Sequence, residues 1–284
     1  MKTPSKPTFD AAGNVSSTAS RPAFPVQLNA VKQNSFAPKK VAAAARTISA
    51  TGQYDLKQPF HASASDGFGL DSAVRARMVH RLAEKGVQDA QVLAAMRTVQ
   101  RHHFVDTALA NMAYEDTSLP IGFGQTISKP NVVARMLELL QHGVHDASGR
   151  LGRVLEIGTG CGYQAAVLSH LAFEVYSRER LRGLHDRARE NLRTLRLANV
   201  HLLFGDGMNG FAKGAPYAAI IAAAGGEAIP PAWIDQLAMG GRLVAPLQDA
   251  SGAQALVVID KTPQGIRQTL LEAVHFVPLK SGVG

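Results

Sequence analysis

The chain has 284 residues, of which 46% are hydrophobic and 18% are charged, so it can bury a sizeable core. No apolar run approaches the roughly 20 residues that cross a bilayer, so we expect no integral membrane protein. A single cysteine, Cys161, excludes an intrachain disulfide and is typical of a reducing compartment, which favours a cytoplasmic protein.

The net charge of +8 is concentrated at the amino terminus. Residues 1–70 contain eight Lys and Arg against three acidic residues, with much Ser, Ala and Pro and no sustained periodicity. This composition predicts a disordered basic extension, although it is also similar to an organellar transit peptide. Residues 71–284 are nearly balanced in charge and show no basic cluster, so we expect no specific nucleic-acid partner.

Helical periodicity begins after the extension. It predicts helices over 73–85, from Asp89 to about 99, and over 131–141, with a turn-rich stretch over 114–130. After Gly152, strands and helices alternate. We expect strands over 153–157, 173–178, 200–204, 218–223, 242–247 and 255–260, a last extended pair over about 265–278, and helices over 163–171, 181–197 and 230–238. The alternation predicts an α/β fold with a doubly wound, mainly parallel, seven-stranded sheet and extra amino-terminal helices.

The segment 154–163 reads Val-Leu-Glu-Ile-Gly-Thr-Gly-Cys-Gly-Tyr, a buried strand that breaks into glycines and then enters a helix. Gly158, Gly160 and Gly162 allow a sharp turn and let a ligand lie against the backbone. Thr159 lies in this loop and Gln164 stands at the start of the helix. We therefore expect all five residues to bind a nucleotide-sized cofactor.

Three acidic residues follow or end successive strands. Glu156 lies inside the first strand. Glu179 follows the second strand and stands 21 residues after Gly158. Asp206 follows the third strand, between Gly205 and Gly207. Glu179 stands where an acid accepts both ribose hydroxyls, and Asp206 where it can bind an adenine amino group. An acid-rich pocket suits a sulfonium cation better than a pyrophosphate, which favours S-adenosylmethionine over NAD.

Several segments resemble the protein-L-isoaspartate (D-aspartate) O-methyltransferase family, in the family's order over about residues 75–280. They are Arg101-His-His-Phe-Val105, Leu119-Pro-Ile-Gly-Phe-Gly-Gln-Thr-Ile-Ser128, Val154–Ala166, Gly205-Asp-Gly207, Ala215-Pro-Tyr217, Ile229–Trp233, Gly240–Pro246 and Phe276-Val-Pro-Leu279. The segment ending at Ser128 is far more specific than the glycine loop. One departure is Ala218, which stands where the family usually has an aspartate.

The resemblance implies a Rossmann-like class I methyltransferase that transfers methyl from S-adenosylmethionine to the free α-carboxylate of L-isoaspartyl residues, leaving S-adenosylhomocysteine. It implies that Ser128 is the active-site hydroxyl, and that Thr126 and Ile127 help to wall the cofactor pocket. A helix cap is the alternative role for Ser128. Such an enzyme repairs damaged proteins, and isoaspartyl proteins and peptides would be its partners; we expect it to act as a monomer.

Methylation of such a carboxylate needs no general base, because an aspartyl-type carboxylate has a pKa of about 4 and is already anionic at neutral pH. His102 and His103 are adjacent and lack paired metal-ligand spacing, so we expect no metal site. Two alternatives stay open: a methyltransferase of the same fold with another acceptor, and a non-catalytic protein that keeps the cofactor pocket.

Overall fold

The computed structural model describes residues 69–143 and 149–284. The predicted disordered extension over residues 1–70 therefore lies almost wholly outside the described residues. The first described element is α1 (Gly69–Glu84), which begins close to the expected domain start at residue 71. Among the described residues, no helix is long and apolar enough to cross a membrane.

The amino-terminal helices precede the sheet in the chain. α2 (Ala90–Thr98) begins where the sequence predicts, because the side chain of Asp89 accepts hydrogen bonds from the backbone N–H groups of Gln91 and Val92, both at 2.9 Å. Two short 3-10 helices follow, η1 (Arg101–Phe104) and η2 (Thr107–Met112), and then α3 (Pro130–Gln141).

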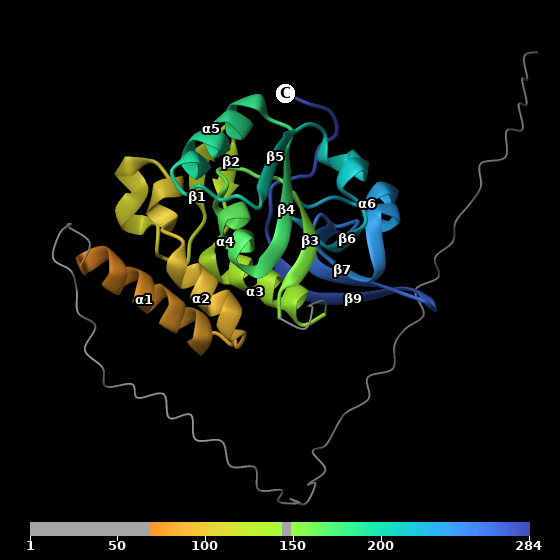
Figure 1. Ribbon diagram of the computed structural model, residues 1–284, viewed down its shortest axis with the longest axis horizontal. Coiled ribbons are helices and arrows are strands. Elements are labelled where there is room, and N and C mark those ends of the chain that lie inside the picture. The colour runs from red at the N-terminus through yellow and green to blue at the C-terminus, as the bar shows by residue number, and fades with distance from the viewer. Residues whose placement is uncertain (1–68, 144–148) are drawn as a thin grey trace, which may run out of the picture. The chain divides into compact units, whose positions relative to one another are not determined.

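Seven strands form one sheet in the order β5-β4-β3-β6-β7-β8-β9 (Figure 1). Their bounds are β3 (Leu151–Ile157), β4 (Ala172–Glu179), β5 (Val200–Phe204), β6 (Tyr217–Ala222), β7 (Leu237–Gln248), β8 (Gln254–Thr262) and β9 (Gly265–Val274). The first five strands in this order are parallel, whereas β8 is antiparallel to both of its neighbours. The chain moves from β3 outward to β5 and then returns to β6 beside β3, which places a crevice at the carboxyl ends of β3 and β6. The predicted doubly wound, mainly parallel sheet is confirmed.

Three helices connect these strands: α4 (Tyr163–Leu171), α5 (Arg182–Arg193) and α6 (Pro231–Gln236). Two predicted helices are too long, because α5 ends at Arg193 and Leu237 already begins β7. The predicted extended pair at the carboxyl terminus is wrong. It is a single strand, β9, which forms a meander with β7 and β8. The stretch expected as turns contains a small antiparallel ribbon, β1 (Leu119–Gly122) and β2 (Gln125–Ile127).

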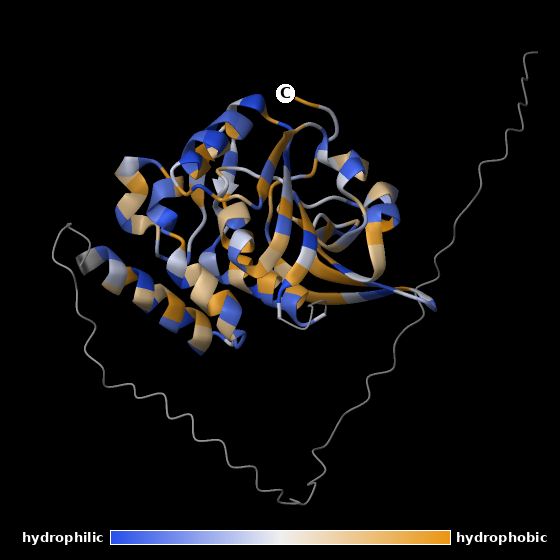
Figure 2. Cartoon of the chain, viewed as in Figure 1, coloured by the Kyte–Doolittle hydropathy of each residue, from blue (hydrophilic) through white to orange (hydrophobic). Residues whose placement is uncertain are grey.

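The strands of the sheet are rich in hydrophobic residues, coloured orange in Figure 2, and their buried side chains pack in two clusters. Alternation along β3 assigns each residue to a face. Val154 packs in the cluster that contains the buried residues of α4, whereas Leu155 and Ile157 pack in a second cluster with Trp233 of α6. Glu156 must therefore lie on the same face as Val154, toward α4.

Candidate active site

The loop between β3 and α4 lies at the carboxyl edge of the sheet. Its glycines adopt left-handed backbone angles, with φ of +57° at Gly160 and +91° at Gly162. A Cβ atom at Gly160 would lie 3.2 Å from the side chain of Ile121 in β1, so a bare backbone lets the ribbon approach the loop. A Cβ atom at Gly162 would lie 3.1 Å from Leu192 of α5, so this glycine serves the packing of α5 against the loop.

A cavity of about 270 Å³ opens beside this loop. Its walls come from the glycine loop with the start of α4, the end of β4 with the start of α5, the β1–β2 ribbon with Ser128, and the carboxyl-terminal segment. Val133 of α3, Gly207 after β5, and Ala223 and Ala224 after β6 complete the lining. Nine of the predicted site residues line it: Thr126, Ile127, Ser128, Gly158, Thr159, Gly160, Gln164, Glu179 and Gly207. Its volume is close to the lower end of the roughly 300–1,000 Å³ typical of small-molecule sites.

Glu179, the last residue of β4, lies at the cavity wall with only 5% of its surface exposed. One carboxylate oxygen accepts the backbone N–H of Gly160 at 2.9 Å, and the other accepts that of Leu181 at 2.9 Å. These bonds aim the carboxylate at the cavity and leave lone pairs for a ligand, since an ionised carboxylate has about four acceptor positions.

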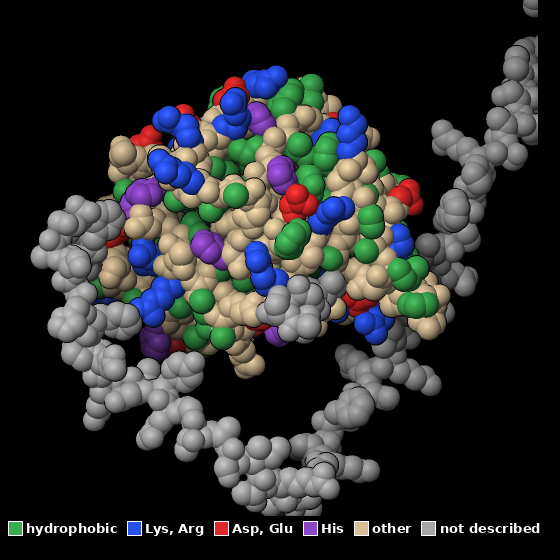
Figure 3. Space-filling model, in the orientation of Figure 1, with side chains coloured by type: hydrophobic (Ala, Val, Ile, Leu, Met, Phe, Trp, Pro, Cys, Tyr) green, Lys and Arg blue, Asp and Glu red, His purple; other side chains and the backbone are tan. Residues whose placement is uncertain are grey.

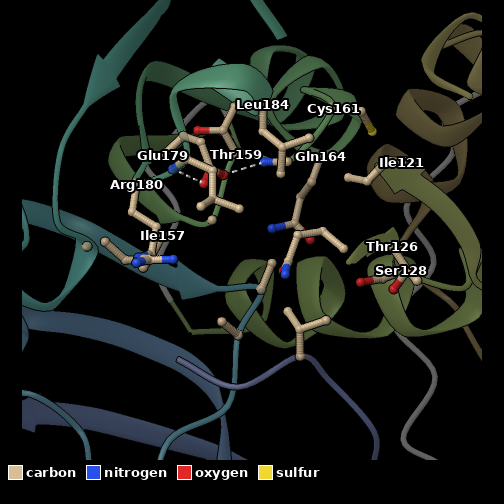
Figure 4. Close-up of a pocket in the computed structure, with 18 of the residues that line it drawn as sticks. Ile121, Thr126, Ser128, Ile157, Thr159, Cys161, Gln164, Glu179, Arg180 and Leu184 are labelled. Carbon is tan, nitrogen blue, oxygen red and sulfur yellow. Dashed lines mark hydrogen bonds between the residues drawn. The ribbon is translucent and has the colours of Figure 1, made fainter. Parts of the chain in front are cut away.

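Ser128 faces the same cavity from the opposite side. Figure 4 shows Thr126 and Ser128 on one side and Glu179 with Arg180 on the other. Ser128 follows β2 and is half-buried. Capping is not its role, because the N-cap of α3 is Lys129, and the backbone N–H of Asn131 in the first turn donates to the carboxylate of Asp116 at 3.0 Å. The Ser128 hydroxyl therefore does not serve the helix end.

Glu156 does not line the cavity. It is fully buried in β3 and accepts a hydrogen bond from the hydroxyl of Ser177, which in turn lies 2.6 Å from the hydroxyl of Thr159. Burial raises the pKa of Glu156 to about 8, while the Ser177 hydrogen bond and the nearby Gln164 amide lower it in part. The carboxyl is thus mostly neutral at pH 7, and it is linked to Thr159 through the hydroxyl of Ser177.

Asp206 also lies outside the cavity lining, although Gly207 belongs to it. The carboxylate of Asp206 accepts the backbone N–H of Met208 and that of Gly282, both at 2.8 Å. The expectation of three acids around one cavity is therefore corrected, since only Glu179 lines it. The electrostatic argument for a sulfonium ligand then rests on one carboxylate, and an adenine contact by Asp206 stays a prediction.

The carboxyl-terminal segment is part of the site that the sequence reasoning missed. Val277, Pro278, Leu279 and Lys280 line the cavity, and Gly282 accepts a hydrogen bond from Arg180 Nε at 2.9 Å. The sequence signal is the Phe276-Val-Pro-Leu279 match, but no local pattern reveals that this segment pairs with Gly225 after β6 and so reaches the cavity. Phe123, at the tip of the β1–β2 ribbon, also lines the cavity although 64% of its surface is exposed.

Two further expectations concern a metal site and the departure from the family at Ala218. Among the described residues, no group of three or more His, Cys, Asp or Glu side chains is arranged to hold a metal ion. His102 contacts the Tyr114 hydroxyl at 2.7 Å and Asp71 at 3.1 Å. Ala218 is the second residue of β6, at the amino end of the strand, and so lies at the edge of the sheet opposite the cavity.

The doubly wound sheet, with a cofactor-sized cavity at the carboxyl ends of its parallel strands, defines a class I, Rossmann-like methyltransferase. A solved structure of a protein-L-isoaspartate O-methyltransferase superposes with a TM-score of 0.66 at 28% identity, covering 74% of this chain and 67% of that one. Another, from Plasmodium falciparum in complex with S-adenosyl-L-homocysteine, shares the fold with a TM-score of 0.61 at 24% identity, covering 72% and 98%.

The sequence comparisons identify the family. The profile of the protein-L-isoaspartate(D-aspartate) O-methyltransferases matches residues 73–284. A protein-L-isoaspartate O-methyltransferase of Methylibium petroleiphilum is 61% identical over 237 residues, covering 80% of this chain and 87% of the relative. One of Leptothrix cholodnii is 62% identical over 219 residues, covering 76% and 77%. The chain belongs to the protein-L-isoaspartate(D-aspartate) O-methyltransferase family.

Proposed function

We propose that this chain uses Ser128 to direct the α-carboxylate of an L-isoaspartyl residue toward a methyl donor. The chain is an S-adenosylmethionine-dependent protein-L-isoaspartate carboxyl O-methyltransferase. The observation that carries the role of Ser128 is its position between two hollows. It lines the cavity beside the glycine loop and also a second hollow, whose other lining residues are Ser118, Lys129, Val132 and the segment 273–276. A residue shared by both hollows can contact an acceptor in one and a donor in the other.

The residues of the cavity fit S-adenosylmethionine. Gly158 and Gly160 present bare backbone, Glu179 offers acceptor positions suited to two ribose hydroxyls, and Leu184 with Ile157 provides apolar wall. S-adenosylmethionine would supply an electrophilic methyl group on a sulfonium. We propose Thr126, Ile127, Thr159, Gln164 and Gly207 as further residues that hold it, because each lines the same cavity.

The residues of the chain have to orient the acceptor carboxylate and exclude water, but they do not have to remove a proton. An isoaspartyl α-carboxylate is ionised at neutral pH, so no proton has to be removed before it attacks. The Ser128 hydroxyl donates a hydrogen bond that orients the carboxylate, and a neutral donor does this without pairing the negative charge in an ion pair. Productive alignment requires reacting atoms about 3–3.5 Å apart, and apolar walls such as Ile121 help to exclude water.

The biological role that we propose is protein repair in the cytoplasm by a monomer. The methyl ester of an isoaspartyl residue collapses to a succinimide, which gives the residue a further chance to become aspartate. The reducing compartment is supported by Cys161, which is buried as a free thiol. On the face in Figure 3, Lys and Arg side chains are interspersed with Asp and Glu, which favours protein substrates over a nucleic-acid partner.

One assay separates this function from the alternatives. Matched peptides that differ only in isoaspartyl versus aspartyl linkage are incubated with labelled S-adenosylmethionine. We expect label in the isoaspartyl peptide alone. Label in other acceptors but not in this peptide would instead indicate a different acceptor, and cofactor binding without any transfer would indicate a non-catalytic protein.

A further inference from the structure

The side chain of Arg101 is fully buried, with 0% of its surface exposed, next to the Ser128 loop. Arg101 begins η1, and its Nε donates to the carbonyl oxygen of Ala113 at 2.8 Å. Its Nη2 donates to the carbonyl oxygen of Ser128 at 2.7 Å. The guanidinium carbon also lies 4.8 Å from the ring centroid of Tyr163, the first residue of α4. One cation therefore contacts both sides of the cavity.

This arrangement fixes a relative position that no backbone pairing provides. Ser128 follows the β1–β2 ribbon, which pairs only with itself, whereas Tyr163 follows the glycine loop of the large sheet. A guanidinium is a rigid planar fork, so its two donors and its stacked face hold three groups in set directions. The position of the Ser128 backbone relative to the glycine loop then depends on this side chain.

We propose that Arg101 is a positioning residue for methyl transfer, which holds Ser128 at the distance from the glycine loop that transfer requires. The inference rests on the proposed role of Ser128. Arg101 does not line the cavity and touches neither substrate, so it acts through the Ser128 backbone. A buried cation that served only packing would affect the stability of the fold and leave the folded enzyme's turnover unchanged.

The matched variants are Arg101→Lys, Ser128→Ala and their combination, with Met78→Ala as control. Lysine keeps the charge but lacks the planar fork, while Met78 is a buried core residue of α1. Turnover is measured at saturating S-adenosylmethionine and low temperature, where the bound ligand favours the folded state. S-adenosylhomocysteine affinity is measured separately by calorimetry.

We expect Arg101→Lys to lower kcat about 10-fold or more, with S-adenosylhomocysteine affinity changed less than about 3-fold, and Met78→Ala to leave kcat unchanged. In the Ser128→Ala background, Arg101→Lys should add little, because both changes remove the same alignment. The proposal is overturned if folded Arg101→Lys has the wild-type kcat. It is also overturned if the fold-losses in kcat of the two single variants multiply in the double variant.

Hydrogen exchange tests the proposal without any acceptor. In the wild-type protein the amides of 126–129 should exchange far more slowly than those of the exposed turn at 122–124. Arg101→Lys should speed exchange at 126–129, whereas Met78→Ala should not. If Arg101→Lys does not fold, Arg101→Gln takes its place. Equally fast exchange of the two wild-type segments overturns the proposal. A wild-type enzyme that shows slow exchange yet fails to methylate isoaspartyl peptides refutes the proposed function instead.

Discussion

The carboxylate of Glu179 accepts the backbone N–H of Gly160 at 2.9 Å and so joins the end of β4 to the glycine loop that follows β3. The same carboxylate accepts the N–H of Leu181, at the start of α5. One side chain thereby ties together two walls of the cofactor cavity. Its ionised form makes these hydrogen bonds stronger than those of a neutral amide would be.

We expect Glu179→Gln to weaken S-adenosylhomocysteine binding about 10- to 100-fold, the equivalent of losing one charge-assisted hydrogen bond. Isothermal titration calorimetry measures this directly. The control is Glu174→Gln, in the same strand but paired with Arg153 and His201 instead of the loop. Equal loss of affinity in both variants would argue against a specific role for Glu179.

We expect Ser128→Ala to lower kcat for an isoaspartyl peptide roughly 10- to 100-fold, because the acceptor carboxylate loses the donor that orients it. Cofactor affinity should largely survive, since the alanine leaves the glycine loop and Glu179 untouched. Single-turnover methylation measures the effect, with Ser251→Ala as control, since Ser251 is exposed in the turn after β7 and lines neither hollow. An unchanged single-turnover rate would exclude this role for Ser128.

The buried carboxyl of Glu156 makes stability depend on pH. Its pKa is raised from 4.5 to about 8, so the folded state binds a proton that the unfolded state has released. This contribution to stability is fully present below about pH 4.5 and is lost as pH rises through about 8. One such proton gives a slope of at most about 1.4 kcal/mol per pH unit.

We therefore expect Glu156→Gln to flatten the decline of unfolding free energy between about pH 5 and pH 8 in cofactor-free protein, because glutamine does not ionise. Urea denaturation at several pH values measures the slope. The control is Glu190→Gln, an exposed residue of α5 that pairs with Arg193. Parallel profiles for Glu156→Gln and wild type would contradict the raised pKa.

Removing residues 281–284 should weaken S-adenosylhomocysteine binding about 2- to 12-fold, the effect of losing roughly one net hydrogen bond at the cavity wall. The lost contacts are those of Gly282 with Asp206 at 2.8 Å and with Arg180 at 2.9 Å, and two backbone hydrogen bonds of Gly284, with Arg182 at 2.8 Å and with Arg180 at 2.9 Å. Calorimetry measures the affinity and urea denaturation checks that the core is intact. Wild-type affinity in the shortened protein would show that this segment does not support the site.

Local sequence patterns were sufficient for much of the fold. The cap at Asp89, the strand before Gly158 and the helix after Gly162 follow from short-range preferences, so they were predicted at nearly their observed bounds. The ends of α5 and α6 were less predictable. Each depends on where the next segment packs into the sheet, and the β7 strand that begins at Leu237 shortens α6.

By itself, the sequence determined the succession of strands and helices along the chain, the glycine loop at the carboxyl edge, and Glu179 beside it, because each of these depends on residues that are close together in the sequence. Only the tertiary structure decided that Glu156 lies buried under Thr159, that Asp206 binds Gly282, and that Arg101 holds Ser128. The Ser177–Glu156, Asp206–Gly282 and Arg101–Ser128 contacts join residues 21, 76 and 27 positions apart. The physical reason is that such pairings depend on how whole elements pack, and local periodicity carries no information about that packing.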